Sequence, residues 1–196
     1  MPHAARMKTR FLLAMAAGVL GVAGLAAQEA KTPAFVERMN YWVRDGGEWR
    51  CANPDYKPGT DQAKEYGYKF TWALHKRAVT LEIFGDFDNG RRITFWHNLS
   101  SWHPVEKRVV MTHLSVGGAV LHGWEETPDA DTRAHEFKGV GPDGSEMRFR
   151  DIARVTGPDT HESTSFAWEN GKWVEQRKMQ WRRVKPVGWG LEEGKF

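Results

Sequence analysis

The sequence predicts an all-β fold, an antiparallel up-and-down β-barrel of about nine or ten strands with one N-terminal capping helix. From Glu48 onward, apolar and polar side chains alternate with a period of two, which is typical of half-buried strands. Short turn motifs such as Asp88-Asn89-Gly90 and Asn170-Gly171 separate these segments. A meander this long normally curls and closes, which favours a barrel; the main alternative is a β-sandwich.

The first 27 residues have the three-part layout of a secretory signal peptide. Arg6, Lys8 and Arg10 precede an uncharged stretch from Phe11 to Ala27 that ends in small residues. The alternative is an uncleaved membrane anchor, because seventeen residues reach the lower limit for a spanning helix. A composition rich in Ala and Gly favours cleavage. We therefore expect an exported protein, periplasmic or extracellular, with no stable membrane span after cleavage.

The charge balance bears on the class of partner. The chain carries 28 basic and 25 acidic residues, a formal net charge of +3. Three of the basic residues lie in the signal, so the mature chain is formally neutral. We therefore expect no nucleic-acid partner. Cys51 is the single cysteine, which excludes an internal disulfide and predicts a buried thiol.

The mature chain divides into one domain and a tail. Residues 28–184 are expected to form the barrel domain, and residues 185–196 a C-terminal tail rich in Gly. Within the domain, residues 32–47 predict a helix that ends at Gly46-Gly47. Its apolar residues recur at helical spacing and form one stripe: Phe35, Val36, Met39, Trp42 and Val43.

The strands follow in order after Glu48. The segments with strand periodicity are 68–74, 79–83, 93–99, 107–116, 119–127, 132–140, 145–155, 161–169 and 172–184.

Loop lengths fix which residues face each other across a hairpin. A two-residue loop at 117–118 pairs His113 with His122, and a four-residue loop at 128–131 places Glu125 on the outer face. The inner face predicted by these registers carries Met111, His113, His122, Trp124, His135 and Phe137.

The last hairpin, around Asn170-Gly171, is registered in the same way. It places Glu175 and Arg177 on the inner face together with Trp168. Isolated charges inside an aromatic lumen are costly, so the two are expected to pair with each other, with Glu162 or with a ligand.

The three inward histidines are the sharpest chemical signal. Such a group can hold a transition metal, supply an axial ligand to haem or transfer protons. The alternative is three core histidines bonded to each other, to Asp151 or to water. No HxH or HExxH spacing is present, so zinc is not specified and the sequence requires no cofactor. His113, His122 and His135 remain the metal candidates.

Aromatic residues dominate the predicted lumen. They form either a wall around an apolar ligand or a filled core. A barrel of more than eight strands is harder to fill with side chains, which favours a cavity. The aromatic set is Tyr68, Phe70, Trp72, Phe95, Trp124, Phe137, Phe149, Phe166, Trp168 and Trp181.

Gly47-Glu48-Trp49 at the start of the first strand, and basic residues such as Arg177 and Arg182 in the last, resemble the calycin superfamily. Lipocalins, fatty-acid-binding proteins and nitrobindin-like haem barrels belong there. The chain is most similar to a lipocalin-like family of bacterial exported proteins of unknown function. The resemblance implies that Trp49 packs across the barrel floor beneath Arg177 or Arg182. The longer Gly-x-Trp-x-Gly-x-Gly motif of nitrobindin-like proteins is interrupted by Arg50-Cys51-Ala52, which argues against their haem binding.

Three functions follow as hypotheses. The leading one is a binding protein that holds a small apolar or amphipathic molecule in the lumen. The second is a histidine-centred barrel enzyme, with or without metal or haem, although no catalytic residue can be assigned. The third is a cell-envelope interaction module with a filled barrel and an exposed loop at 102–104. The residues expected to contact a ligand are Met111, His113, His122, Trp124, His135, Phe137, Glu175 and Arg177.

Overall fold

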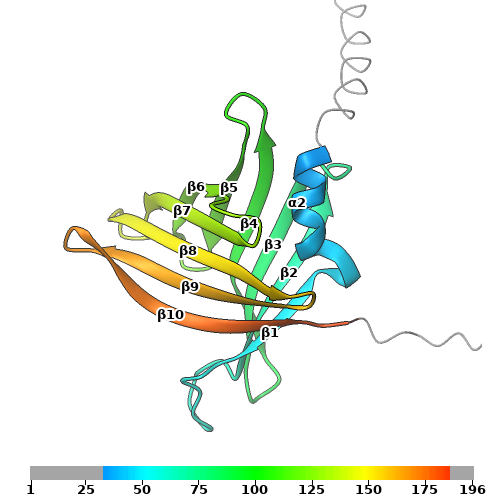
Figure 1. Ribbon diagram of the computed structural model, residues 1–196. Coiled ribbons are helices and arrows are strands. Elements are labelled where there is room, and N and C mark those ends of the chain that lie inside the picture. The colour runs from blue at the N-terminus through cyan, green and yellow to red at the C-terminus, as the bar shows by residue number, and fades with distance from the viewer. Residues whose placement is uncertain (1–32, 186–196) are drawn as a thin grey trace, which may run out of the picture. The chain divides into compact units, whose positions relative to one another are not determined.

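The computed structural model describes residues 33–185, which form a closed antiparallel barrel of ten strands preceded by one helix (Figure 1). The predicted fold class is therefore confirmed. The predicted signal peptide, residues 1–27, lies outside the described residues, and so does the predicted tail beyond Lys185.

The helices and strands occur close to their predicted places. They are α2 (Pro33–Val43), the 3-10 turn η2 (Arg44–Gly46), β1 (Glu48–Ala52), β2 (Glu65–Ala73), β3 (Ala78–Asp86), β4 (Arg92–His103), β5 (Arg108–Ser115), β6 (Val120–Glu126), β7 (Thr132–Val140), β8 (Glu146–Gly157), β9 (Thr160–Glu169) and β10 (Lys172–Arg183).

Each strand pairs with its neighbours in the sequence, and β1 pairs with β10 to close the sheet. The closing seam brings Trp49 opposite Arg183 and Arg50 opposite Arg182. Closure removes the exposed edges that a ten-strand meander would otherwise present to solvent.

Gly47 sets the junction between the helix and the first strand. Its φ of 68° lies in the left-handed region that favours glycine. A Cβ at this position would stand 2.1 Å from the carbonyl oxygen of Phe70, so the close approach of β2 also requires a glycine.

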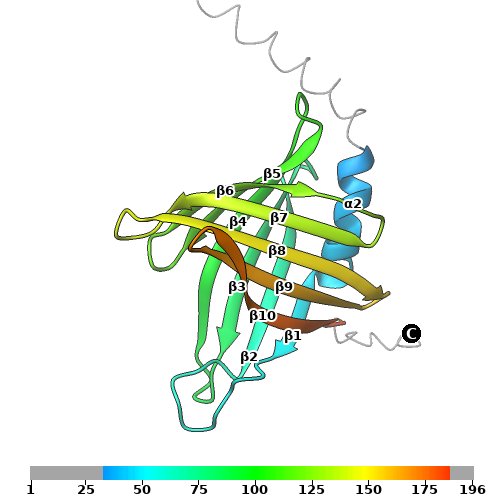
Figure 2. The same cartoon turned by 60° about the vertical axis from the view of Figure 1, so that its left-hand side comes forward.

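The helix α2 covers one end of the barrel, beside the start of β7 and the end of β8 (Figure 2). The apolar stripe predicted from the sequence faces inward, with Phe35, Met39 and Trp42 buried in the core. Phe35 meets Trp72 of β2 edge to face, with ring centroids 6.2 Å apart. Cys51 is also buried, as expected for a structural thiol.

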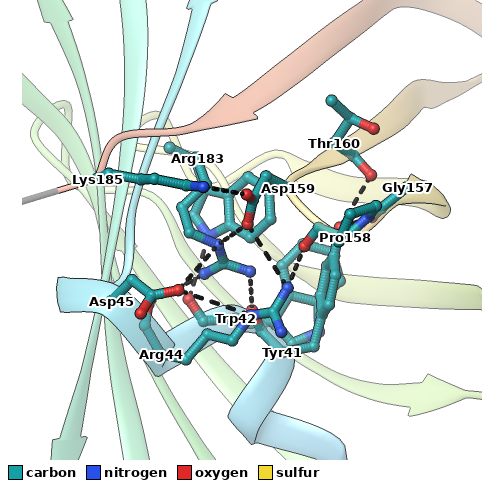
Figure 3. Close-up of polar contacts among 11 residues, drawn as sticks. Tyr41, Trp42, Arg44, Asp45, Gly157, Pro158, Asp159, Thr160, Arg183 and Lys185 are labelled. Atoms are coloured by element: carbon teal, nitrogen blue, oxygen red, sulfur yellow. Dashed lines mark hydrogen bonds and ion pairs between the residues drawn. The ribbon is translucent and has the colours of Figure 1, made fainter.

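Arg183, at the end of β10, joins three parts of the chain at this end (Figure 3). Its guanidinium carbon lies 4.0 Å from the centre of the Trp49 ring, and its side chain is 0% exposed. The same group donates hydrogen bonds to the carbonyl oxygens of Tyr41 and Arg44 and to the Asp159 carboxylate. Each of the three guanidinium nitrogens thus donates a hydrogen bond, and the buried cation ties α2 to the seam.

The resemblance placed Arg177 or Arg182 over Trp49, and both assignments are wrong. Arg182 is exposed and lies on the outer face, while Arg177 lines the lumen further along the strand. Arg183 occupies the position because it pairs directly with Trp49 across the seam.

Replacing Arg183 tests this arrangement. In Arg183→Met the apolar stem remains, but the carbonyls of Tyr41 and Arg44 and the Asp159 carboxylate lose the hydrogen bonds of the guanidinium. We expect the free energy of unfolding to fall by roughly 2–3 kcal/mol in urea titrations. Arg182→Met, the control at the neighbouring outward position, should change it by less than about 0.5 kcal/mol. Equal stability of the two variants would contradict the role given to Arg183.

Candidate functional site

The barrel encloses a cavity of about 590 Å³. This volume lies within the range of about 300–1,000 Å³ that small-molecule sites occupy. The lumen is thus open rather than filled. Most of its wall is aromatic or aliphatic: Tyr68, Phe70, Val79, Leu81, Ile83, Phe95, Trp96, Phe137, Met179 and Trp181.

The cavity runs between two unlike ends. Met39 and Trp42 of α2 line it at the covered end. At the other end it is lined by Val116, which is itself 74% exposed, so the cavity reaches solvent there. We call this second end the mouth. The β5–β6 loop forms part of it.

Five of the eight residues expected to contact a ligand line this cavity. They are Met111, His113, His135, Phe137 and Arg177. The three others, His122, Trp124 and Glu175, face away from it, for reasons of register.

The β5–β6 loop has three residues, 116–118, instead of the predicted two. The extra residue places His113 opposite Leu121 rather than opposite His122. His122 pairs with Thr112 and is exposed on the outer face. The predicted trio of inward histidines is therefore wrong.

The next hairpin is also shifted by one residue from the predicted register, because Glu126 pairs with Ala134 instead of with Arg133. Glu125 consequently lies opposite His135, and Trp124 lies opposite Glu136 on the outer face. Both hairpins of β6 thus differ from their predicted registers by one residue. The two shifts exchange the inward and outward faces of β6 alone, while β5 and β7 keep their predicted faces. Glu125 takes the inward place predicted for Trp124.

A bulge in β10 separates the two charges predicted for the lumen. Glu175 pairs with Phe166, but Arg177 pairs with Ser165, so Gln176 is the extra residue. A bulge exchanges the faces of the residues beyond it. Arg177 therefore points into the lumen and Glu175 points outward.

The predicted aromatic wall divides accordingly. Tyr68, Phe70, Phe95, Phe137 and Trp181 line the cavity, Trp72 and Phe149 pack against the core around it, and Trp124, Phe166 and Trp168 face outward.

Glu125 is the most buried charge of the wall, with a side chain only 2% exposed. It accepts hydrogen bonds from Arg133 at 3.0 and 3.1 Å, from Arg38 of α2 at 3.2 Å and from His135 at 3.2 Å. Burial alone would raise the pKa of Glu125. The hydrogen bond from His135 and the positive charges of Arg133 and Arg38 outweigh burial and lower the pKa to about 2.

His135 lies between two carboxylates. Its Nε2 bonds to Glu125, and its Nδ1 lies 3.9 Å from Asp151, which stands opposite it on β8. Burial lowers the pKa of His135, but the two carboxylates outweigh burial and raise it to about 9. The imidazole is therefore charged at neutral pH. Arg38, Glu125, Arg133, His135 and Asp151 together form the lumen charge cluster.

His113 has the opposite state. Burial, aided by the nearby charge of His135, lowers the pKa of His113 to about 3, so its ring is neutral. Its ring centroid lies 4.2 Å from that of Phe137. Among residues 33–185, no group of three or more His, Cys, Asp or Glu side chains is arranged to hold a metal ion.

The sequence did not predict several residues of the wall, among them His161 of β9 and Asn98 of β4. The inward position of Asn98 was not predicted because β4 carries a bulge at Phe95, between the partners of Ile83 and Phe84. Beyond the bulge, the polar residues Asn98 and Ser100 face the lumen. Uninterrupted alternation predicts the other, more apolar set of residues on that face. Nothing in the pattern of β4 marks that bulge.

Removing the carboxylate of Glu125 should destabilise the protein strongly. Glu125→Gln keeps the shape but leaves Arg133 and His135 without their shared anion. We expect a loss of roughly 3–5 kcal/mol in the free energy of unfolding, measured in urea. The neighbouring exposed residue supplies the control, because Glu126→Gln should cost less than about 0.5 kcal/mol. A small effect of Glu125→Gln would show that its ion pairs carry little stability.

The raised pKa of His135 predicts a loss of stability at alkaline pH. The contribution is complete below the ordinary histidine pKa of 6.5 and disappears as the pH rises through about 9. Urea titrations between about pH 6 and pH 9 should show this decline in the wild type and in His122→Gln. His135→Gln should show a flatter profile. Parallel profiles of stability against pH for all three proteins would contradict the raised pKa of His135.

Comparison with known proteins adds no relative: no family model matches the chain, and a search of curated proteins finds no match. Among the helices within residues 33–185, none is long and apolar enough to cross a membrane.

Proposed function

We propose that this protein is an exported, lipocalin-like binding protein that holds a small apolar or amphipathic molecule in its barrel. One observation carries the proposal: a cavity of about 590 Å³ whose wall is mostly aromatic and aliphatic. Such walls bind ligands by removing apolar surface from water, while a few polar groups fix their orientation.

Arg177 gives the mouth of the cavity a polar contact. It is exposed, lines the cavity and lies with its guanidinium carbon 5.1 Å from the centre of the Tyr66 ring. Tyr66 stands at the start of β2, whereas Trp72 near the end of that strand meets α2. A polar group of an amphipathic ligand would therefore lie toward the mouth, and its apolar part deeper.

Two further features support the family and the location. The seam contact of Trp49 with Arg183 resembles the Trp and Arg pair of calycin barrels, which supports a lipocalin-like assignment. Export rests on the charged, apolar and small-residue segments of residues 1–27.

The alternatives have less support. An open lumen does not fit the hypothesis of an interaction module with a filled barrel. The enzyme hypothesis relied on three inward histidines, and His122 lies on the outer face. His113 and His135 remain in the wall, where they fit polar contacts of a bound molecule.

Filling part of the lumen should weaken binding strongly. Ser165 lines the cavity, and Thr164 beside it lies on the opposite face of β9. The wild type should bind phenylnaphthylamine, an uncharged fluorescent probe, saturably and with enhanced emission. Ser165→Trp places an indole in the lumen and should weaken binding by at least about tenfold. Thr164→Trp should bind the probe as the wild type does.

Two results would overturn the proposal. One is a wild type that shows no saturable binding of the probe. The other is equal binding by Ser165→Trp and Thr164→Trp, which would place the probe outside the barrel.

A further inference from the structure

Two buried polar side chains of the cavity wall carry nitrogen atoms that have no hydrogen-bond partner among residues 33–185. His161 is 1% exposed, and neither of its ring nitrogens is bonded. Asn98 is 4% exposed, and its Nδ2 is unbonded. Both residues line the cavity. Buried polar groups are nearly always paired, because an unpaired one loses its hydration without compensation.

The imidazole of His161 is held in an aromatic cage. Trp42 and Trp49 meet it edge to face, with ring centroids 4.7 and 4.6 Å away, and Trp181 lies within 9° of parallel. Burial, together with the positive charge of Arg183, lowers the pKa of His161 to about 3. The ring is therefore neutral, with one N–H donor and one lone pair that accepts.

The cage cannot satisfy that lone pair. The face of an indole accepts weakly from an N–H but donates nothing. Two of the three indole donors of the cage are engaged elsewhere: Nε1 of Trp49 donates to the carbonyl of Trp42, and Nε1 of Trp181 donates to Ser163. Nε1 of Trp42 makes no hydrogen bond to either ring nitrogen of His161. The acceptor nitrogen of His161 therefore requires a donor that comes from the cavity.

Asn98 presents the complementary requirement. The hydroxyl of Ser100 donates to Oδ1 of Asn98 at 2.7 Å, which fixes the amide and leaves Nδ2 as the free donor. An amide N–H of this kind is satisfied by a carbonyl or ether oxygen.

The two groups lie on opposite walls of the lumen. In the order of the ten-strand barrel, β4 and β9 are five strands apart in either direction. The charges deep in the wall, Glu125, His135 and Asp151, already contact one another within the lumen charge cluster. A deeply bound charge would lack a counter-ion there, so an uncharged molecule fits best.

Given the lumen binding proposed above, we propose that the ligand is an uncharged ring compound bearing a hydroxyl group and a carbonyl oxygen at separate positions. The hydroxyl donates to His161, and the carbonyl accepts from Nδ2 of Asn98. The aromatic cage favours a flat ring system next to His161.

Matched probes test the hydroxyl contact. The short pair is para-hydroxyacetophenone and para-methoxyacetophenone, and the long pair is estrone and its methyl ether. Each ether keeps the carbonyl and the ring but cannot donate a hydrogen bond. By calorimetry, the wild type should bind the hydroxyl member of at least one pair about tenfold more tightly.

Variants assign the contacts. His161→Phe keeps an aromatic ring but removes both nitrogens, so the preference for the hydroxyl should vanish while ether binding persists. Asn98→Leu should weaken both members of the pair about equally, by about tenfold. His122→Phe, the outward control, should leave the preference unchanged.

A measurement without any ligand separates this role from a structural one. Because the nitrogens of His161 are unpaired, ligand-free His161→Phe should unfold at the same or a higher urea concentration than the wild type. Marked destabilisation of that variant would overturn the inference. Equal binding of hydroxyl and ether in both pairs would also overturn it, yet leave lumen binding intact. Failure of phenylnaphthylamine to bind would instead refute the proposed function itself.

Discussion

The contact of the Arg183 guanidinium with the Trp49 indole is the interaction on which the covered end of the barrel depends. The two residues face each other across the seam where the last strand meets the first. Through the carbonyls of Tyr41 and Arg44, the same guanidinium also holds the end of the helix. A buried cation is tolerated only when it is paired and hydrogen-bonded, and the Asp159 carboxylate supplies the counter-ion. One side chain thus couples sheet closure to the position of α2.

With α2 held there, Met39 and Trp42 close the cavity at one end, while Arg177 marks the mouth. The polar groups between them are of two kinds. The charged ones satisfy each other within the lumen charge cluster, which makes that part of the wall a structural element. The neutral ones include His161, whose two ring nitrogens are unpaired among residues 33–185, and Asn98, whose Nδ2 is unpaired there. This is the pattern expected of groups kept for a ligand at a cost in stability.

The sequence was sufficient for the strands, their order, the helix and closure, because each rests on a pattern repeated over many residues. The faces of single side chains were less predictable, because they depend on loops and bulges of one residue. One extra residue on each side of β6 exchanged Trp124 for Glu125 in the lumen. The bulge at Gln176 separated Glu175 from Arg177. The positions of bulges depend on the twist and closure of the whole barrel, so no local sequence motif predicts them.

The central claim is that the lumen holds a small molecule, and native mass spectrometry of protein purified from its own host tests it most directly. We predict that the wild-type protein carries one non-covalently bound small molecule, seen as added mass. Denaturation should release this molecule, and the released compound should be uncharged. A protein whose lumen is filled by substitution should carry none. Bare chain mass for the wild type under conditions gentle enough to retain non-covalent ligands would contradict the account.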